Sequence, residues 1–357
     1  MSIPDPTPQS SDPARGPVLV ATEAVVPPSV SAAGARPEKE LIIATRAFTE
    51  ENKARGWLIT FSSLAILAGL TAGAIFSPWW PLRLVFALIE GLTIVRVFCL
   101  FHDFQHGAIL RQSKFAEFIY FVFGTSILVP PSVWRETHNY HHAHTAKIVG
   151  SHIGSYPVVT TAMWKDLTPV QKFGYKAVRS PLNMFLAVFT VFSIGMCIKP
   201  VVRAPTKHWG GALSLVWIYG LGVAAFLTDH LDWWIFGWLI PMWLAAMTGA
   251  YLFYAQHNFP DGHIASRQDW TFARAATDSS SYMVMGPVMN WFTANIGFHH
   301  VHHLNAAIPF YRLPEAMQAI PELQHPGKTS LWPKDVAACF ALKVWDPEQN
   351  KMVGYPS

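Results

Sequence analysis

Residues 57–76 form an unbroken run of twenty residues without a charged side chain, WLITFSSLAILAGLTAGAIF. A helix rises about 1.5 Å per residue, so about 20 apolar residues cross the hydrocarbon core of a bilayer. Because lipid offers no hydrogen-bond partner to backbone N–H and C=O groups, such a segment must be helical. Only 13% of the whole chain is charged, whereas soluble domains have about a quarter. The sequence therefore predicts a membrane protein built from helices.

Three further apolar stretches are long enough to span a bilayer, at residues 82–101, 211–228 and 233–256. Together with 57–76 they predict two transmembrane helical hairpins, about four spans in all. Glu90 and Arg96 interrupt the second stretch, and ionisable groups inside a span have either a functional role or a stabilising contact. The apolar run 118–129 is too short to span, and we expect it to lie in the interface or to dip into protein.

Lysine and arginine in short loops predict the orientation, because cytoplasmic loops are enriched in both. Residues 36–56 contain five of them and the turn at 77–81 contains none, so the first hairpin returns the chain to the cytoplasm. Basic residues flank the stretch 182–198 on both sides, and we expect it to lie along the cytoplasmic interface or to re-enter. The turn at 228–232 has two aspartates and no basic residue, which suits an external loop.

Thirteen of the sixteen histidines lie in 102–152 or 257–303, within segments that this topology places in the cytoplasm. They form three clusters, HDFQH at 102–106, HNYHH at 138–142 and FHHVHHL at 298–304. Crowded histidines are costly, since neighbouring imidazolium charges repel one another. Residues three or four positions apart share one face of a helix, so each cluster can direct several ring nitrogens the same way.

His257 adds a ninth imidazole where the stretch 233–256 reaches the cytoplasm. Nine imidazoles from four places along the chain could surround two metal ions and leave positions open for another ligand. Neutral imidazole binds iron, zinc and copper, so the residues alone do not choose the metal. The candidate ligands are His102, His106, His138, His141, His142, His257, His299, His302 and His303.

Other residues near the clusters are candidates for supporting roles. A ligating imidazole needs its second nitrogen held by a partner, and Asp103 is well placed for that. Trp134 and Arg135, just before the second cluster, are either contacts for a substrate or lipid headgroup, or interfacial anchors. Weaker ligand candidates are His144, His152, His263 and His300. The three cysteines have no close spacing, which argues against a Cys-based metal site, and no basic patch with interleaved aromatics predicts nucleic-acid binding.

With these motifs the chain resembles the integral-membrane fatty acid desaturases, from about residue 55 to 320. The resemblance rests on HDFQH, HNYHH and HHVHH in this order around two hydrophobic hairpins. It is nearest to bacterial acyl-lipid desaturases of the Δ12/ω6 type, through VWRETHNYHHAHT (133–145), YAQHNF (254–259) and NIGFHHVHHLNAAIPFYRLPEA (295–316). Close relatives often have HDCGH as the first cluster. Phe104 and Gln105 leave the ligands unchanged here and alter what surrounds them.

The resemblance implies a non-haem di-iron centre, two Fe ions held by the nine histidines named above. It also implies O2 as co-substrate and two electrons from a separate donor, ferredoxin or a cytochrome. The implied reaction introduces a cis double bond into an acyl chain of a membrane lipid. We expect an all-α, multi-pass protein of the bacterial inner membrane, with interfacial helices and a cytoplasmic helical cap that holds the site.

The domain organisation follows from composition. Residues 1–38 are rich in Pro, Ser, Ala and Val, and we expect a disordered tail. Residues 39–320 are expected to form the membrane domain with its cap, and residues 321–357 a C-terminal cytoplasmic extension.

Two other functions compete with desaturation. Membrane hydroxylases and carotenoid ketolases share the three histidine clusters, so the chain could instead hydroxylate or ketolate a lipid or carotenoid. A metal transporter would carry ligands along a path inside its spans. Residues 57–101 contain no histidine and 211–256 contain only His230, at the external turn, which disfavours transport.

Overall fold

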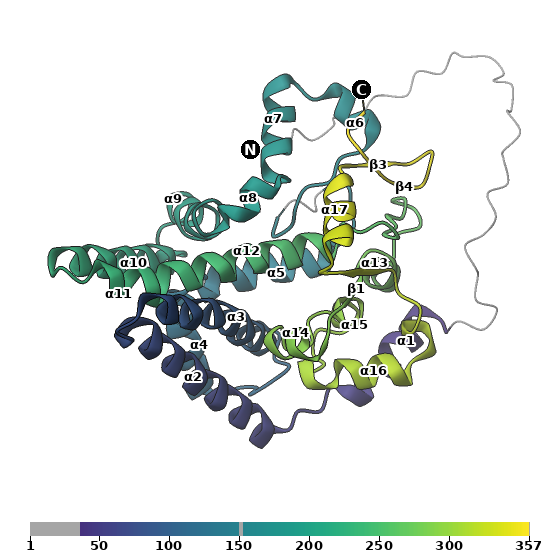
Figure 1. Ribbon diagram of the computed structural model, residues 1–357. Helices are drawn as coiled ribbons and strands as arrows, with labels where there is room; N and C mark the ends of the chain where they lie inside the picture. Colours follow the sequence, from purple (N-terminus) through teal and green to yellow (C-terminus); the bar gives the residue numbers. More distant parts are fainter. Residues whose placement is uncertain (1–35, 150–152, 357) are drawn as a thin grey trace, which may run out of the picture. The chain divides into compact units, whose positions relative to one another are not determined.

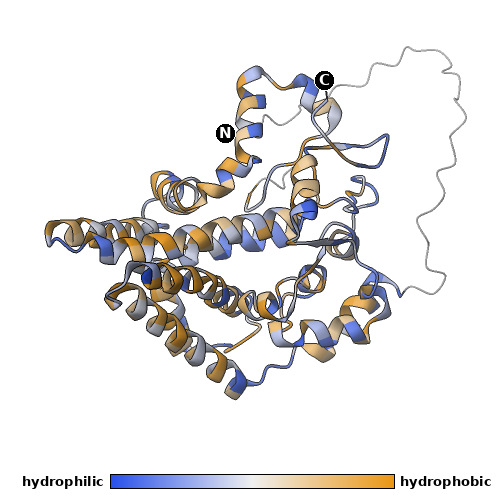
Figure 2. Cartoon of the chain, viewed as in Figure 1, coloured by the Kyte–Doolittle hydropathy of each residue, from blue (hydrophilic) through white to orange (hydrophobic). Residues whose placement is uncertain are grey.

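Four long apolar helices dominate the structure, a computed structural model that describes residues 36–149 and 153–356. Each is long and apolar enough to cross a bilayer, and Figure 2 shows the hydrophobic residues along them. They are α2 (Lys53–Phe76), α3 (Trp80–Gln105), α10 (Trp209–Leu227) and a continuous helical stretch, Leu231–Ala255. The predicted all-α membrane fold with about four spans is confirmed.

The helix α3 lies at the centre of the spans, packed against α2 and against α12 (Ile240–Ala255). Gly91 permits the close approach of α3 to α12. A Cβ atom at this position would lie 2.8 Å from the backbone oxygen of Pro241 and 3.0 Å from Cβ of Leu244. Because the two helices touch there, their ends can bring His102 and His257 into one site.

The fourth span, Leu231–Ala255, is not a uniform α-helix. It begins with α11 (Leu231–Trp234), continues as a π-helical turn, η3 (Ile235–Leu239), and becomes α12 at Ile240. Pro241 has no N–H to donate to the preceding turn. A wider turn directly before a proline lets the helix continue without that hydrogen bond.

Glu90 and Arg96 of α3 do not pair with each other. Arg96 donates through Nε to the hydroxyl of Ser63 at 2.9 Å, through Nη1 to the backbone oxygen of Trp291, and lies 4.1 Å from the centre of that tryptophan ring. Glu90 accepts a hydrogen bond from the Thr71 hydroxyl at 2.6 Å. These contacts tie α3 to α2 and to the segment that carries Trp291.

The predicted short apolar run 118–129 lies mostly in α4 (Lys114–Ser126). This helix meets α5 (Pro131–His144) at a bend of 91°. Pro130 and Pro131 stand at the bend, and proline both disfavours helix in the residue before it and starts a helix well. The bend turns the second histidine cluster toward the ends of α3 and α12.

The predicted interfacial stretch 182–198 consists of α8 (Pro181–Phe185) and the π-helical η2 (Val188–Ile198), followed by α9 (Lys199–Arg203). It packs against α10 and α12, while Leu182, Phe185 and Phe189 remain exposed. It is not among the four helices fit to span a bilayer. Its position at the cytoplasmic interface stays a prediction.

The shorter elements gather in Figure 1 around the end of α12 that lies away from α11. The helices are α1 (Glu38–Thr45), η1 (Arg46–Phe48), α6 (Thr161–Asp166), α7 (Pro169–Val178), α13 (Phe272–Asp278), α14 (Pro287–Phe292), α15 (His299–Leu304), η4 (Phe310–Arg312), α16 (Leu313–Ala319), η5 (Pro321–Leu323) and α17 (Pro333–Ala341). Of the predicted disordered tail, residues 1–35 lie outside the described part of the chain.

Two small sheets join these helices. The strand β1 (Tyr282–Val284) pairs in parallel with β2 (Lys328–Ser330), with Met283 opposite Thr329. The strands β3 (Val344–Asp346) and β4 (Lys351–Val353) form an antiparallel pair. Leu323 and Cys339 are buried in the main hydrophobic core, so the C-terminal segment packs onto the rest of the chain.

Candidate metal centre

All nine histidines predicted as ligands converge at one place. The first cluster stands at the end of α3, the second on α5, and the third on α15, while His257 follows α12 by two residues. Their ring nitrogens form two groups, and within each group the nitrogens lie within 4.8 Å of one another. The five-histidine group is His102, His106, His138, His142 and His302, and the four-histidine group is His141, His257, His299 and His303.

Helical spacing explains how each cluster is divided. His102 and His106 are four positions apart, and their rings meet edge to face with the centres 4.7 Å apart. On α5 and α15, adjacent histidines of the nine belong to different groups, because the side chains of consecutive helical residues point about 100° apart. His142 joins the five-histidine group while His141 joins the other. Both α5 and α15 thus contribute to both groups, which places the two groups side by side.

The spacing of the nitrogens suits octahedral metal ions. Neighbouring Nε2 atoms are 3.0–3.2 Å apart in the five-histidine group and 3.0–3.1 Å apart in the other. For metal–imidazole distances of about 2.1 Å, ligands at right angles are about 3.0 Å apart, and tetrahedral ligands about 3.4 Å. The observed separations match the right-angle arrangement.

Burial keeps the imidazoles neutral, which is the form that binds metal. It lowers the pKa of His299, His302 and His303 well below the ordinary value, and the neighbouring imidazoles lower these pKa values further. Burial also lowers the pKa of His257 to about 4. In the described residues the buried Nε2 of His106 has no hydrogen-bond partner. A neutral, converging set of lone pairs with such an unpaired nitrogen fits a pair of metal ions.

Several outer nitrogens are held by the protein. Nδ1 of His102 lies 3.2 Å from Oδ1 of Asp103, whose Oδ2 accepts a 2.7 Å hydrogen bond from the backbone N–H of Phe310. His257 donates through Nδ1 to the backbone oxygen of Ser279 at 3.1 Å. Such contacts fix the ring orientation and leave the Nε2 lone pair facing the site.

The sequence has relatives among known proteins. Residues 77–334, most of the chain, match the fatty acid desaturase family. The chain belongs to this family. It is 28% identical over 282 residues to a fatty acid desaturase of Bacillus subtilis (strain 168), covering 77% of this chain and 78% of the relative. The resemblance that the three histidine clusters indicate is confirmed, and the family is one of oxidoreductases.

Two further relatives are acyl-lipid enzymes. An sn-1 acyl-lipid omega-3 desaturase (ferredoxin) of Nostoc sp. (strain 36) is 26% identical over 331 residues, which cover 86% of this chain and 87% of the relative. An sn-1 oleoyl-lipid 12-desaturase of Synechocystis sp. (strain ATCC 27184 / PCC 6803 / Kazusa) is 19% identical over 311 residues, with 84% and 86% covered.

In this member of the desaturase family, Trp134 adjoins the five-histidine group. Its ring stacks on His138, with the centres 4.6 Å apart and the planes at 18°, and meets Phe98 edge-on at 4.9 Å. Its buried indole N–H has no partner in the part of the chain that the structure describes. Arg135 is exposed and donates through Nε to the side-chain oxygen of Gln105 at 3.0 Å.

Three of the weaker ligand candidates belong to neither group. His144 stacks on Tyr140, with ring centres 3.9 Å apart. His263 lies beside Trp345. His300 is buried and donates through Nε2 to the backbone oxygen of Leu323 at 3.1 Å. The fourth candidate, His152, lies outside the described residues.

Two partners of the outer nitrogens, and the donor that holds Asp103, were not predicted from the sequence. Thr145 is four residues after His141, and its hydroxyl lies 3.3 Å from Nδ1 of His303; helical spacing from the second cluster could have indicated it. Ser279 and Phe310 act through backbone atoms. Their side chains carry no sequence signal for this role.

Proposed function

We propose that this chain is an O2-dependent membrane desaturase that introduces a cis double bond into an acyl chain of a lipid at a non-haem di-iron centre. The nine histidines in two adjacent groups would hold the two Fe ions. The observation that carries the proposal is the division of these histidines. Two groups of nitrogens at right-angle spacing are built on shared helices, in a chain of the desaturase family.

The chemistry of the substrate demands such a centre. An unactivated methylene has no acidic proton and no leaving group, so an acid–base or nucleophilic side chain cannot attack it. Two bound iron ions with O2 would supply an oxidant strong enough to remove hydrogen atoms. Per double bond, two hydrogens leave adjacent carbons, and O2, two electrons and two protons enter, so that two water molecules are released.

The protein would position the iron ions and shield them from bulk water. The nine imidazoles would hold the two ions and leave positions open for another ligand. Asp103 would hold the His102 ring in place, and the backbone oxygen of Ser279 would hold His257. Burial of the imidazoles excludes bulk water, which keeps a reactive oxidant from side reactions.

The substrate is proposed to be an acyl chain of a membrane lipid, with desaturation of the Δ12/ω6 type. The acyl-lipid activities in the names of the cyanobacterial relatives support this class. Trp134 would contact the acyl chain, because its apolar ring lies against His138 beside the five-histidine group. Arg135 would contact the lipid headgroup, since it is a surface cation one position along the same helix.

The two electrons would come from an external donor, ferredoxin or a cytochrome. The name of the Nostoc relative includes ferredoxin, which supports the first. We place the enzyme in the bacterial inner membrane with its catalytic face in the cytoplasm. The five basic residues in 36–56, which precede α2 or stand in its first turn, support this orientation.

Product analysis tests the proposal. The chain would be expressed in a host without polyunsaturated lipids, and its fatty acids compared by mass spectrometry with those from a His302→Ala variant. A diene formed only by the intact chain supports Δ12/ω6 desaturation. A hydroxylated or keto product from an iron-loaded chain would overturn it in favour of the hydroxylase or ketolase alternative.

A further inference from the structure

A short path of bonds leads from a half-buried tryptophan to the four-histidine group. Trp270 donates its indole N–H to the backbone oxygen of Thr145 at 2.9 Å. The Thr145 hydroxyl donates to the backbone oxygen of His141 at 2.8 Å, and Nδ1 of His303 lies 3.3 Å from the same hydroxyl. Because the Thr145 hydroxyl donates its hydrogen to the backbone oxygen of His141, Nδ1 of His303 is the donor in the contact between His303 and Thr145.

Burial sets the order of these residues from outside to inside. The exposed fractions of Thr145 and His303 are 4% and 1%, so neither can be touched by another protein. Trp270 is half-buried and is therefore the outermost member of the path. Electron transfer weakens steeply with distance and with gaps between atoms. A path of covalent bonds and two short polar contacts favours transfer along it.

We propose that Trp270 and Lys147 form the docking point of an acidic one-electron carrier protein, and that electrons pass from there through Thr145 and His303 to the four-histidine group. This inference rests on the proposed function, because a desaturase of this kind needs an external donor. The carrier belongs to the class of acidic iron–sulfur proteins. In each transfer the reduced carrier loses one electron and a ferric ion held by the histidines gains it, without bond making or breaking. Two transfers supply one turnover.

Charge favours an acidic partner here. The ammonium of Lys147 lies 3.9 Å from the centre of the Trp270 ring. Among the described residues Lys147 has no carboxylate partner within ion-pair distance. The Lys147 charge is thus available to a carboxylate of a docking protein, directly over the outermost ring of the path.

Two other cations, Lys114 and Arg312, are less suited to this role. Near the end of α3 and the start of α4, Lys114 pairs with Glu117 at 2.8 Å. Not far along the chain from the third cluster, Arg312 pairs with Glu315 at 2.9 Å. Carboxylates of the chain itself already neutralise these cations, and a docking protein would have to displace them.

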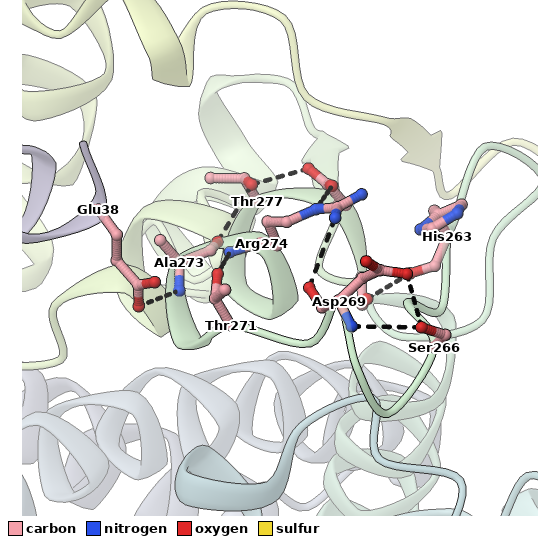
Figure 3. A network of polar contacts seen from close by, with 10 residues as sticks. Glu38, His263, Ser266, Asp269, Thr271, Ala273, Arg274 and Thr277 are labelled. Carbon is pink, nitrogen blue, oxygen red and sulfur yellow. Dashed lines mark hydrogen bonds and ion pairs between the residues drawn. The ribbon is translucent and has the colours of Figure 1, made fainter. Parts of the chain in front are cut away.

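The backbone around Trp270 is held firmly. Figure 3 shows Asp269, Thr271 and Arg274 within one network of polar contacts. The Ser266 hydroxyl donates to Asp269 at 2.6 Å just before Trp270, and the Thr271 hydroxyl caps α13 by accepting from the N–H of Arg274. Glu38 of α1 accepts a hydrogen bond from the N–H of Ala273. An anchored turn of this kind fixes the indole against Thr145.

The position in the fold suits a water-soluble carrier. In Figure 1, α13, which begins two residues after Trp270, lies at the opposite end of α12 from α11 and packs against α15. With the proposed orientation this end of the molecule faces the cytoplasm. A soluble carrier can therefore reach Trp270 without entering the bilayer.

The test uses the full-length iron-loaded protein in nanodiscs and a bacterial [2Fe–2S] ferredoxin as the probe. The variants are Trp270→Leu and Lys147→Glu, with Trp332→Leu as matched control, because Trp332 is 71% exposed and stands at the start of α17. Anaerobic stopped-flow mixing measures the rate at which the diferric protein oxidises reduced ferredoxin. Dithionite reduction of the same samples measures how readily a small reductant reaches the iron.

We expect Trp270→Leu to slow ferredoxin oxidation on the order of tenfold and to leave the dithionite rate and iron content unchanged. Lys147→Glu is expected to weaken binding of oxidised ferredoxin about fivefold, measured without turnover. Trp332→Leu should match the parent in both assays. An unchanged ferredoxin rate in Trp270→Leu, or a parallel fall in the dithionite rate, overturns the inference. If the parent forms no unsaturated product, the proposed function fails separately, since neither assay involves lipid.

Discussion

Oδ1 of Asp103 lies 3.2 Å from Nδ1 of His102, although the two residues are neighbours in one helix. Asp103 is also joined to the N–H of Phe310, far along the chain. The carboxylate therefore links the end of α3 to the segment after α15, and it holds a member of the five-histidine group in its orientation.

Asp103→Asn should weaken iron binding by about 10- to 100-fold, because partners of the outer imidazole nitrogen have effects of that size. Iron titration with a competing chelator measures the affinity. Glu348→Gln, on an exposed turn, is the control and should bind iron like the parent. Equal affinity in Asp103→Asn and the parent would show that the carboxylate does not support the site.

His302→Ala and His300→Ala form a matched pair on one short helix, since both side chains are fully buried and only His302 belongs to a group. We expect His302→Ala to lose iron from the five-histidine group and to lose activity. His300→Ala should keep its iron but lose about 1–3 kcal/mol of stability, because the Leu323 backbone oxygen loses its donor. Iron analysis and thermal unfolding separate these outcomes; iron loss in both variants would contradict the assignment.

Acid should destabilise the iron-free protein. Burial lowers the pKa of His257 and of His300 to about 4 in the folded state, while the unfolded value is about 6.5. As the pH falls from about 6.5 to about 4, the unfolded chain binds protons that the folded chain does not, so the free energy of unfolding decreases. Thermal unfolding of the iron-free protein should therefore give a lower Tm at pH 5 than at pH 7.5. A Tm that is constant over this range would contradict the prediction.

Gly91→Ala should destabilise the protein by about 1–3 kcal/mol and lower its iron content. The added methyl group would lie 2.8 Å from the Pro241 backbone oxygen, so α3 and α12 must separate. Gly69→Ala, in α2 where nothing lies within 4 Å of the new atom, is the control and should be neutral or slightly stabilising. Unfolding in detergent and iron analysis measure both effects. Equal behaviour of the two variants would argue against close packing at Gly91.

The spans and the candidate ligands were open to prediction because each depends on a local pattern. Twenty apolar residues predict a span, and histidines three and four positions apart predict a shared helical face. The division of the candidate ligands into two groups was not predictable, since His141 and His142 are adjacent and only the packing of α5 assigns them to different groups. The two small sheets were not predicted either. Strands of three residues, such as β1 and β3, are too short to show the alternation of apolar and polar residues that marks a strand.

Because α5 and α15 each carry histidines of both groups, these two helices would couple the positions of the two ions. On each helix a single peptide step separates the rings that serve different ions, so covalent geometry, rather than the packing of one hairpin on the other, governs the distance between the ions. His102 and His106, at the end of α3, belong to one group, and His257, which follows α12, belongs to the other, so a shift between these helices would alter the two sets of ligands unequally. The adjacent rings on α5 and α15 would then keep the two ions close together while the rings supplied from the spans adjust around them.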